Sequence, residues 1–209
     1  MNEWSPTVFR LKDYLQVGRM TLAQMRKALG LAVYDVEPEL VSMARHNADL
    51  LMKRYETEKI SRDWDIKDKQ SIFYGLLGEE IFKATLYQLH IPHLHTHPLY
   101  PHKIRTPHDF EVDGKTIQVK TIPFGDIYKN LAVKRKEWSK SDFVVPIKLV
   151  DEQLTQAHII GFLTGNEVEN LPVADGTYPC PYEPCYHCLL EEVTKKHPVY
   201  ELFRILKHK

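Results

Sequence analysis

The stretch HDFEVDGKTIQVKT, residues 108–121, constrains the fold more than any other part of the chain. It contains Asp113-Gly114, a strong signal for a two-residue β-hairpin, because a type I′ turn needs positive φ at both central residues. A turn at this point pairs Val112 with Lys115, and the pairing continues outward along two antiparallel strands. We therefore expect the chain to contain at least one sheet with a tight hairpin.

The same register separates polar from apolar side chains, because successive residues of a strand point to opposite faces. The apolar face carries Phe110, Ile117 and Val119. The polar face carries Asp109, Glu111, Gln118 and Lys120. Two interpretations stay open, namely a half-solvated amphipathic hairpin and a functional site, because a carboxylate, an amide and an ammonium are costly to bury without a purpose.

The polar group has the composition needed for metal-assisted phosphodiester hydrolysis. That reaction needs oxygen ligands for Mg²⁺ or Mn²⁺ and a positive group near the attacking water or the developing phosphate charge. Asp109 and Gln118 offer the oxygens, and Lys120 offers the positive group.

Residues 71–89, SIFYGLLGEEIFKATLYQL, have apolar side chains at helical spacing and are expected to form a helix. Gly75 and Gly78 weaken a helix by about 1 kcal/mol each relative to alanine, so they predict close packing against another element. The histidine-rich stretch 90–108 that follows is interpreted as an extended segment or loop with polar surface histidines.

These segments together resemble the PD-(D/E)xK nuclease superfamily, which has the restriction-endonuclease-like fold. The resemblance covers about residues 71–170. It is carried by GLLGEEIF in the predicted helix, HDF and QVK in the hairpin, and SDFVVPIKL and IIGFLTGNEV in later segments. It implies an α/β core with a mixed central sheet flanked by helices. It also implies an Mg²⁺- or Mn²⁺-dependent deoxyribonuclease, an endonuclease by preference.

The resemblance also assigns roles to individual residues. Glu79 would be the helix carboxylate, with Glu80 as the alternative, because adjacent helical acids point about 100° apart and only one can face the hairpin. Asp109 would be the central metal ligand, Gln118 would occupy the (D/E) position and Lys120 would be the catalytic lysine.

The sequence departs from the motif at two positions. His108 replaces a proline that has no chemical role. Gln118 replaces an acid, and a neutral amide attracts a cation less strongly than a carboxylate. An active enzyme is favoured because Asp109, Lys120 and a helix acid remain, and a DNA-binding module that has lost cleavage is the alternative.

The run LAVKRKEWSK places consecutive cations beside an aromatic residue, a pattern suited to phosphate contact and base stacking. The residues predicted to contact DNA are Lys134, Arg135, Lys136 and Trp138. A solvated surface balanced by neighbouring acids is the other interpretation.

Cys180, Cys185 and Cys188 are the chain's three cysteines, and their clustering argues against a disulfide framework and for metal ligation. A structural zinc site would take a histidine as fourth ligand, either His187 or His197 or one brought in by the fold. Some RecB-like nucleases carry an iron–sulfur cluster, but with an upstream cysteine that this chain lacks. Zinc, iron–sulfur and free thiols all stay open, and so does a zinc-stapled structural or interaction protein.

The expected organisation is a helical region at residues 1–70, the nuclease core at 71–170 and a cysteine-bearing subdomain with a terminal helix at 171–209. The formal net charge is zero, so an argument for DNA has to be local. The N-terminus lacks the layout of a signal peptide and no long apolar run is present, which predicts an intracellular, cytoplasmic protein without a membrane partner. Many members of the superfamily act as dimers, so a homodimer is a further expectation.

Overall fold

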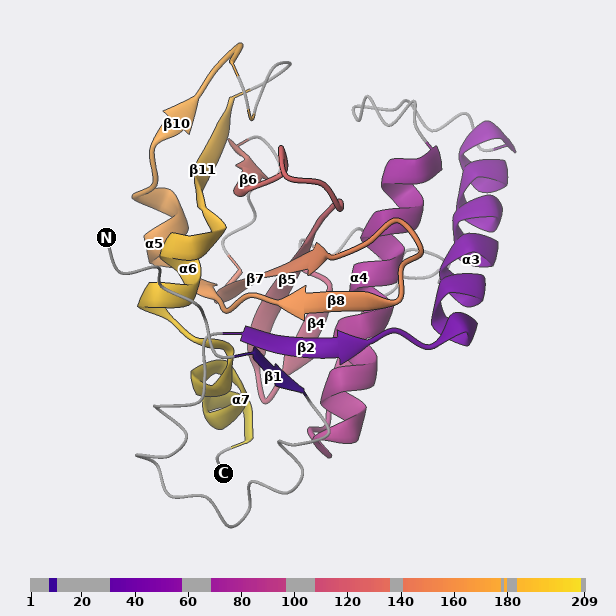
Figure 1. Cartoon of the computed structure of the whole chain (residues 1–209), viewed down its shortest axis with the longest axis horizontal. Helices are drawn as coiled ribbons and strands as arrows, with labels where there is room; N and C mark the ends of the chain where they lie inside the picture. The colour runs from indigo at the N-terminus through magenta and orange to yellow at the C-terminus, as the bar shows by residue number, and fades with distance from the viewer. Residues whose placement is uncertain are drawn as a thin grey trace.

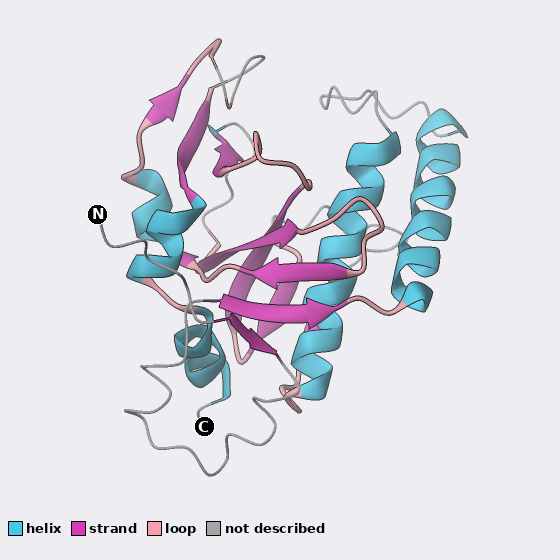
Figure 2. Ribbon diagram, in the orientation of Figure 1, coloured by secondary structure: helices cyan, strands magenta, loops and turns pink. Residues whose placement is uncertain are grey.

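A computed structural model of the chain describes residues 8–10, 31–57, 69–96, 108–135, 141–177, 179 and 184–207. A mixed eight-stranded sheet lies at its centre, and helices α3 and α4 lie side by side along one flank (Figure 1). The long helices are α3 (Pro38–Thr57) and α4 (Lys69–Gln88). Figure 2, in the same orientation, shows the helices in cyan and the strands of the sheets in magenta.

The central sheet has the strand order β1-β2-β8-β7-β5-β4-β3, and β9 pairs with β7 beside β8. Its strands are β1 (Val8–Arg10), β2 (Leu31–Asp35), β3 (Leu94–His95), β4 (Phe110–Val112), β5 (Lys115–Ile122), β7 (Phe143–Leu149), β8 (Gln156–Ile159) and β9 (Leu163–Thr164). Strand β5 runs parallel to β7, β1 runs parallel to β2, and the other pairs are antiparallel.

The predicted hairpin is confirmed as strands β4 and β5. Asp113 and Gly114 have φ values of 51° and 73°, the positive angles that a type I′ turn requires. Val112 pairs with Lys115, as the turn position predicted. The hairpin is therefore determined locally, by two adjacent residues.

Pro146 lies inside β7, where a proline is unexpected because it cannot donate a ladder hydrogen bond. On this side of β7 the partner strand changes, since β9 pairs as far as Val144 and β8 begins its pairing at Ile147. Pro146 falls in the gap, and its carbonyl accepts a hydrogen bond from Ile160 N at 3.1 Å. The sheet thus tolerates proline where β7 pairs with neither β9 nor β8, because no ladder hydrogen bond from the Pro146 nitrogen is needed there.

The two faces of β7 contribute to two hydrophobic cores, because its side chains alternate. Phe143, Val145 and Ile147 pack into the larger core with α3 and α4. Val144 points the other way, into a smaller core shared with β6 and β11. The face of β7 opposite the long helices is therefore covered by a second layer.

That second layer is a three-stranded sheet, with strand order β10-β11-β6. Its strands are β6 (Asn130–Lys134), β10 (Val173–Ala174) and β11 (Cys185–Leu189), and the neighbouring helices are α5 (Gly165–Glu169), α6 (Leu190–Lys196) and α7 (Val199–Lys207). No separate cysteine-rich subdomain is evident in the described part of residues 171–209, because β11 pairs with β6 from the predicted core. The expectation of such a subdomain is corrected accordingly.

The N-terminal region is not purely helical either. Helix α3 is confirmed, with Pro38 as its first residue, where a missing N–H costs nothing. Residues 31–35, however, form β2, which pairs with β8 inside the central sheet. Among the described helices, none is long and apolar enough to cross a membrane.

Candidate active site

Helix α4 directs one of its two adjacent acids at the sheet. The Glu79 Oε2 atom lies 3.0 Å from Nε2 of His95 on β3, and the Glu79 side chain is 15% exposed. Glu80 bonds instead to the Nζ atom of Lys83 at 3.0 Å, and its charge also acts on Glu79 and His95. The structure thus places the preferred acid, Glu79, beside the hairpin. Glu80 is only 3% exposed and is not the solvated charge that helical geometry suggested.

The α4 backbone lies very close to β5, which brings Glu79 within reach of the strand. A Cβ atom added at Gly78 would lie 1.9 Å from Thr121 Oγ1 and 3.0 Å from Thr121 Cβ, so no larger side chain fits without a shift. The prediction of close packing is confirmed for Gly78. Gly75 has no described atom within 4 Å of its added Cβ, so close packing does not explain that glycine.

Asp109 is held at the start of the hairpin by its own backbone and side chain. Its N–H donates to Ile117 O at 2.9 Å, and its carbonyl accepts from Thr96 N at 2.8 Å. Its carboxylate Oδ2 accepts from the backbone N–H of Val119 at 2.7 Å. The Asp109 carboxylate is therefore fixed against β5, the strand that carries Gln118 and Lys120.

The two carboxyl groups and Lys120 influence one another electrostatically. Burial raises the pKa of Asp109 to about 7, with a further contribution from the charge of Glu79. Burial also raises the pKa of Glu79 to about 8, with a further contribution from Glu80. Lys120 opposes both shifts, so its ammonium lies within the field of both acids. Glu79, Asp109 and Lys120 are therefore a cluster in the sense that their charges act on one another in the folded chain.

His95 is a member of this cluster that sequence reasoning missed. Its ring stacks on Phe110, with centroids 4.4 Å apart and planes 5° from parallel, because the two residues pair across β3 and β4. Burial lowers the pKa of His95 to about 4, so its ring is neutral at pH 7. The interpretation of the loop histidines as polar surface groups is wrong for His95. The sequence signal was an alternating HLHTH pattern, which indicates a strand rather than a loop.

Gln118 supplies an oxygen that has no bond. Its side chain is 8% exposed, and its Oε1 atom is buried without a hydrogen-bond partner among the described residues. A buried acceptor left unbonded costs about 1 to 3 kcal/mol, so a ligand that satisfied it would recover that energy.

The donor set fits a hard divalent cation, which prefers oxygen ligands. Glu79 and Asp109 offer carboxylate oxygens, and Gln118 offers an amide oxygen. Within the described residues no group of three His, Cys, Asp or Glu side chains could hold a metal ion. Gln118 is opposite Val144 in the β5–β7 pairing, so its side chain leaves β5 on the face away from α4, and its amide oxygen would have to reach the two acids from that face.

The predicted basic surface is described only in part. Lys134 ends β6 and is half-buried, while Arg135 is exposed and donates its backbone N–H to Pro184 O at 3.0 Å. Lys136 and Trp138 lie outside the described residues.

The described cysteines do not come together as a thiolate site. Cys185 is disulfide-bonded, whereas Cys188 is a free, buried thiol whose pKa burial raises to about 11. The two lie three residues apart on β11 and therefore point to opposite faces, Cys185 beside Ala174 and Cys188 into the smaller core. His187 is half-buried on the same strand, and Cys180 lies outside the described residues. The expectation that the cysteines form no disulfide is wrong for Cys185. Zinc or an iron–sulfur cluster at these residues stays a prediction, and it requires Cys185 in its reduced form, because only a thiolate ligates the metal.

Comparisons of the chain with protein-family models, with curated proteins and with solved structures found no match. The resemblance to PD-(D/E)xK nucleases therefore rests on the motif residues alone, and the function has to be argued from the geometry of the site.

Proposed function

We propose that this chain is a metal-dependent deoxyribonuclease that hydrolyses phosphodiester bonds at the site formed by Glu79, Asp109, Gln118 and Lys120. One observation carries the proposal. Two mostly buried carboxyl groups from different elements share the field of one lysine, and Gln118 on the same strand offers a buried oxygen without a bond. Burying such a group lowers the stability of the fold, and groups of this kind are typical of functional sites.

Asp109, Glu79 and Gln118 are the residues that would hold Mg²⁺ or Mn²⁺. Their environment is suited to a cation, because the raised pKa of both acids reflects burial with too little positive charge nearby. Such an ion, when bound, polarises a phosphate oxygen and stabilises the charge that develops on it.

Lys120 is the group that acts on the water and the phosphate. An ammonium has three N–H donors and no acceptor, so Lys120 can orient an attacking water or donate to a phosphate oxygen that gains charge. Its half-buried position strengthens both interactions, because water screens them less. His95 holds Glu79 in place through the hydrogen bond to Oε2. Lys134 and Arg135 would contact DNA at a distance from the reacting bond.

The decisive test is cleavage of single- and double-stranded DNA by the purified full chain with Mg²⁺ or Mn²⁺, beside a chelator control and Lys120→Ala. We expect metal-dependent cleavage that Lys120→Ala abolishes. Lys115→Ala is the matched control, because Lys115 is an exposed lysine of the same strand at the hairpin turn and should retain activity. If wild type and Lys120→Ala are both folded and both inert on every substrate, the proposal is wrong.

A second candidate function is a DNA-binding module that keeps the site without cleavage. It is favoured by the neutral amide of Gln118 at a position where the resemblance leads us to expect an acid. Under this alternative, Gln118→Glu would create cleavage that wild type lacks. Strong wild-type cleavage without a gain in Gln118→Glu would exclude it.

A further inference from the structure

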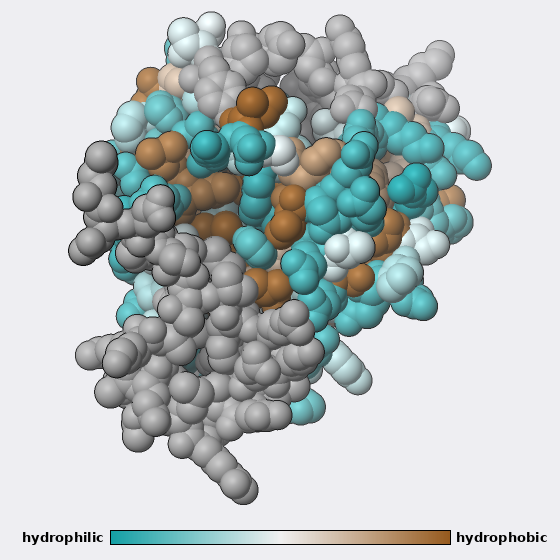
Figure 3. All heavy atoms as spheres, viewed as in Figure 1, coloured by the Kyte–Doolittle hydropathy of each residue, from teal (hydrophilic) through white to brown (hydrophobic). Residues whose placement is uncertain are grey.

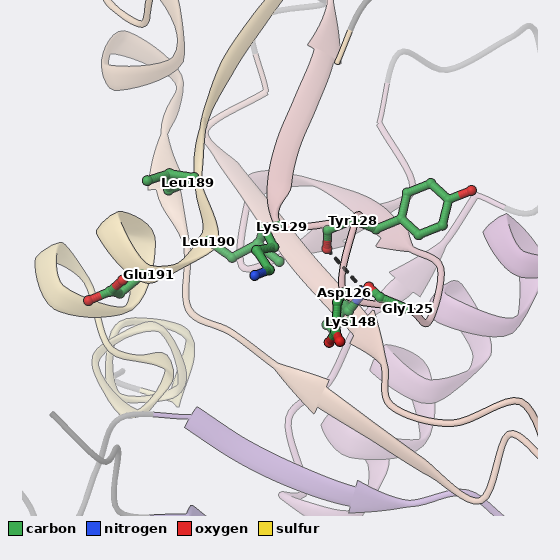
Figure 4. Close-up of a pocket in the computed structure, with 8 residues that line it drawn as sticks. All are labelled: Gly125, Asp126, Tyr128, Lys129, Lys148, Leu189, Leu190 and Glu191. Carbon is green, nitrogen blue, oxygen red and sulfur yellow. Dashed lines mark hydrogen bonds between the residues drawn. The ribbon is translucent and has the colours of Figure 1, made fainter. Parts of the chain in front are cut away.

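The loop between β5 and β6, residues 123–129, is fixed in place by a single lysine. Lys148 on β7 is half-buried, and its ammonium donates to the carbonyl oxygens of Pro123, Gly125 and Tyr128, the last two at 3.0 Å (Figure 4). These three bonds use all three donors of the ammonium. Lys148 is therefore occupied in holding the β5–β6 loop and has no donor left for a ligand.

Other contacts complete the conformation of the loop. Gly125 has a φ of 104°, a conformation that favours glycine, and its carbonyl also accepts from Tyr128 N at 3.2 Å. The Lys148 ammonium lies 5.6 Å from the centre of the Tyr128 ring. The end of the loop is tied to α6, because Leu190 N donates to Lys129 O at 2.9 Å. The loop is thus preorganised before any ligand binds.

This fixed loop presents apolar side chains to solvent. Ile127 is 69% exposed and Tyr128 is 39% exposed. Figure 3, drawn from the same side as Figure 1, shows hydrophobic side chains interrupting the hydrophilic surface of this face. Ile127 and Tyr128 are adjacent in a loop that three hydrogen bonds to Lys148 hold in place, so together they offer an apolar surface at a fixed position.

Among the described residues around the loop, Lys129 is a cation for which no ion pair is seen. A hollow of about 350 Å³ lies between the loop and the start of α6 (Figure 4). Two acids line this hollow, Asp126 and Glu191. Each has a cation close by, because the charge of Asp126 acts on Lys148 and Glu191 forms an ion pair with Lys195. Lys129 also lines the hollow, is exposed and has no ion-pair partner among the described residues. The uncompensated charge at the hollow is therefore positive, which suits a phosphate.

The loop also lies on the face of the central sheet from which Lys120, a residue of the proposed site, projects. In the β5–β7 pairing, Lys120 is opposite Pro146, and Ile122 is opposite Lys148. Lys120 and Lys148 consequently project from the same face of the sheet, two residue steps apart, or about 7 Å along the strands. Because Lys148 holds the loop on this face, the loop borders the surface toward which Lys120 points.

We infer that the β5–β6 loop binds an unpaired nucleotide of the DNA substrate, with the base against Tyr128 and Ile127 and a phosphate at Lys129. The inference rests on the proposed nuclease function and makes its substrate class more specific. Bases inside a duplex are stacked on each other, so only an unpaired base offers a face to an aromatic side chain. In Figure 4 the Tyr128 ring points away from Leu189, Leu190 and Glu191, so the base and the phosphate would lie on opposite sides of the loop.

The test measures binding separately from cleavage. Fluorescence anisotropy with the full chain, in chelator, compares a short labelled single strand, a blunt duplex and a duplex with a single-stranded tail. We expect tighter binding to the single strand and the tailed duplex than to the blunt duplex. Tyr128→Ala should weaken binding to both unpaired probes roughly tenfold, while leaving the blunt duplex unchanged. Tyr128→Phe is the matched control and should bind like wild type, because the aromatic face is kept.

Two further variants test the other parts of the inference. Lys129→Ala should lower the slope of log affinity against log salt by about 1, as expected when one phosphate contact is lost. Lys148→Met should also weaken binding to the single strand, although Lys148 itself would not contact DNA. The substitution removes the three hydrogen bonds that hold the β5–β6 loop in place. Thermal melting of each variant distinguishes loss of a contact from loss of the fold.

The outcomes separate this inference from the nuclease proposal. If wild type cleaves DNA but Tyr128→Ala and Lys129→Ala bind every probe like wild type, the loop inference is wrong and the nuclease proposal stands. Equal wild-type affinity for all three probes would also overturn the inference. If folded wild type neither binds nor cleaves any probe, both proposals are wrong.

Discussion

Two acids of this molecule, the half-buried Glu167 and the more deeply buried Asp109, have contrasting surroundings. Glu167, on α5, has a carboxylate that accepts four hydrogen bonds, two from Thr164, one from Lys196 and one from His197. Among the described residues, the Asp109 carboxylate accepts one hydrogen bond, from Val119 N, and the acid whose charge acts on it most strongly is Glu79. Within this part of the chain, the Glu167 carboxylate therefore has more hydrogen-bond donors than the Asp109 carboxylate.

The pKa values express the same difference. Partial burial would raise the pKa of Glu167, but its bonds to Lys196, Thr164 and His197 outweigh burial and lower the pKa to about 2. Burial raises the pKa of Asp109 to about 7, and its bond to Val119 N and the charge of Lys120 do not compensate. A satisfied acid stabilises the fold, whereas an unsatisfied acid is retained at a cost in stability, which is typical of a functional site.

The largest expected effect separates the two sites by activity. Asp109→Asn should reduce metal-dependent DNA cleavage about a thousandfold, since about 4 kcal/mol of transition-state stabilisation is lost with the metal ligand. Glu167→Gln should leave kcat within a few-fold of wild type when assayed below its melting temperature. Steady-state kinetics on the same DNA substrate measures cleavage by both variants. Equal losses of activity would show that Asp109 has no special role in cleavage compared with Glu167.

In stability, Glu167→Gln should be the more damaging of the two variants, the opposite of their order in activity. Glu167→Gln should lower the free energy of unfolding by about 2 to 3 kcal/mol, because Lys196, His197 and the Thr164 N–H lose a charged acceptor. Asp109→Asn should raise the free energy of unfolding of the metal-free protein at pH 8. Urea unfolding of both variants tests this, and a destabilised Asp109→Asn would contradict the account of Asp109 as an unsatisfied acid.

The glycines of α4 should respond oppositely to the same substitution. Gly78→Ala should destabilise the protein by about 1 to 3 kcal/mol and weaken cleavage, because the added Cβ displaces α4, and Glu79 with it, from Thr121. Gly75→Ala should stabilise by about 0.5 to 1 kcal/mol, since its Cβ would enter open space in a helix. Melting temperatures of the two variants, with cleavage rates, provide a matched comparison within one helix.

The two acidic sites should also differ in how stability depends on pH. Asp109 and Glu79 have folded pKa values of about 7 and 8, above their ordinary values of 3.8 and 4.5, so their contribution is present at low pH and is lost as pH rises through 7 and 8. The metal-free protein should lose about 1 to 2 kcal/mol between pH 6.5 and 8.5. The pKa of Glu167 is lowered to about 2, so Glu167 changes stability only below about pH 4.5 and adds nothing in this range.

Mg²⁺ provides the check on that pH dependence. A cation bound by the two acids should stabilise the protein more at pH 8.5 than at pH 6.5, because binding at the lower pH has to displace protons. Urea unfolding at both pH values, with and without Mg²⁺, measures the difference. The same pH dependence in Asp109→Asn, Glu79→Gln and wild type would assign it to other groups.

The parts of the fold that the sequence predicted are those encoded locally. Asp113-Gly114 forces the hairpin turn wherever the strands lie, and the helical spacing of residues 71–89 predicts α4. What the sequence did not predict depends on distant partners. Residues 31–35 form a strand because β8 is there to pair with them, and β11 joins β6 rather than a separate cysteine subdomain.

The residues of the candidate site also fall into a group that the sequence predicted and a group that it did not. The two-residue period of a strand already placed Gln118 and Lys120 on one face, and the spacing of Asp109 from the turn placed it beside them. His95 was not predicted, because its role depends on burial against Phe110 and on the approach of α4, neither of which is written in the HLHTH stretch. The fixed β5–β6 loop was not predicted either, because Lys148 is 20 residues from Tyr128 in the chain.

The sequence by itself determined the hairpin, the long helices and the identity of the polar groups, because these follow from backbone angles and side-chain periodicity within a few residues. Only the tertiary structure decided which acids are satisfied. Glu167 meets Lys196 and His197 across about 30 residues, and Asp109 meets the charge of Glu79 across the same length of chain. Desolvation and charge act through space, so the difference between a stabilising acid and a reactive one arises only when the chain is folded.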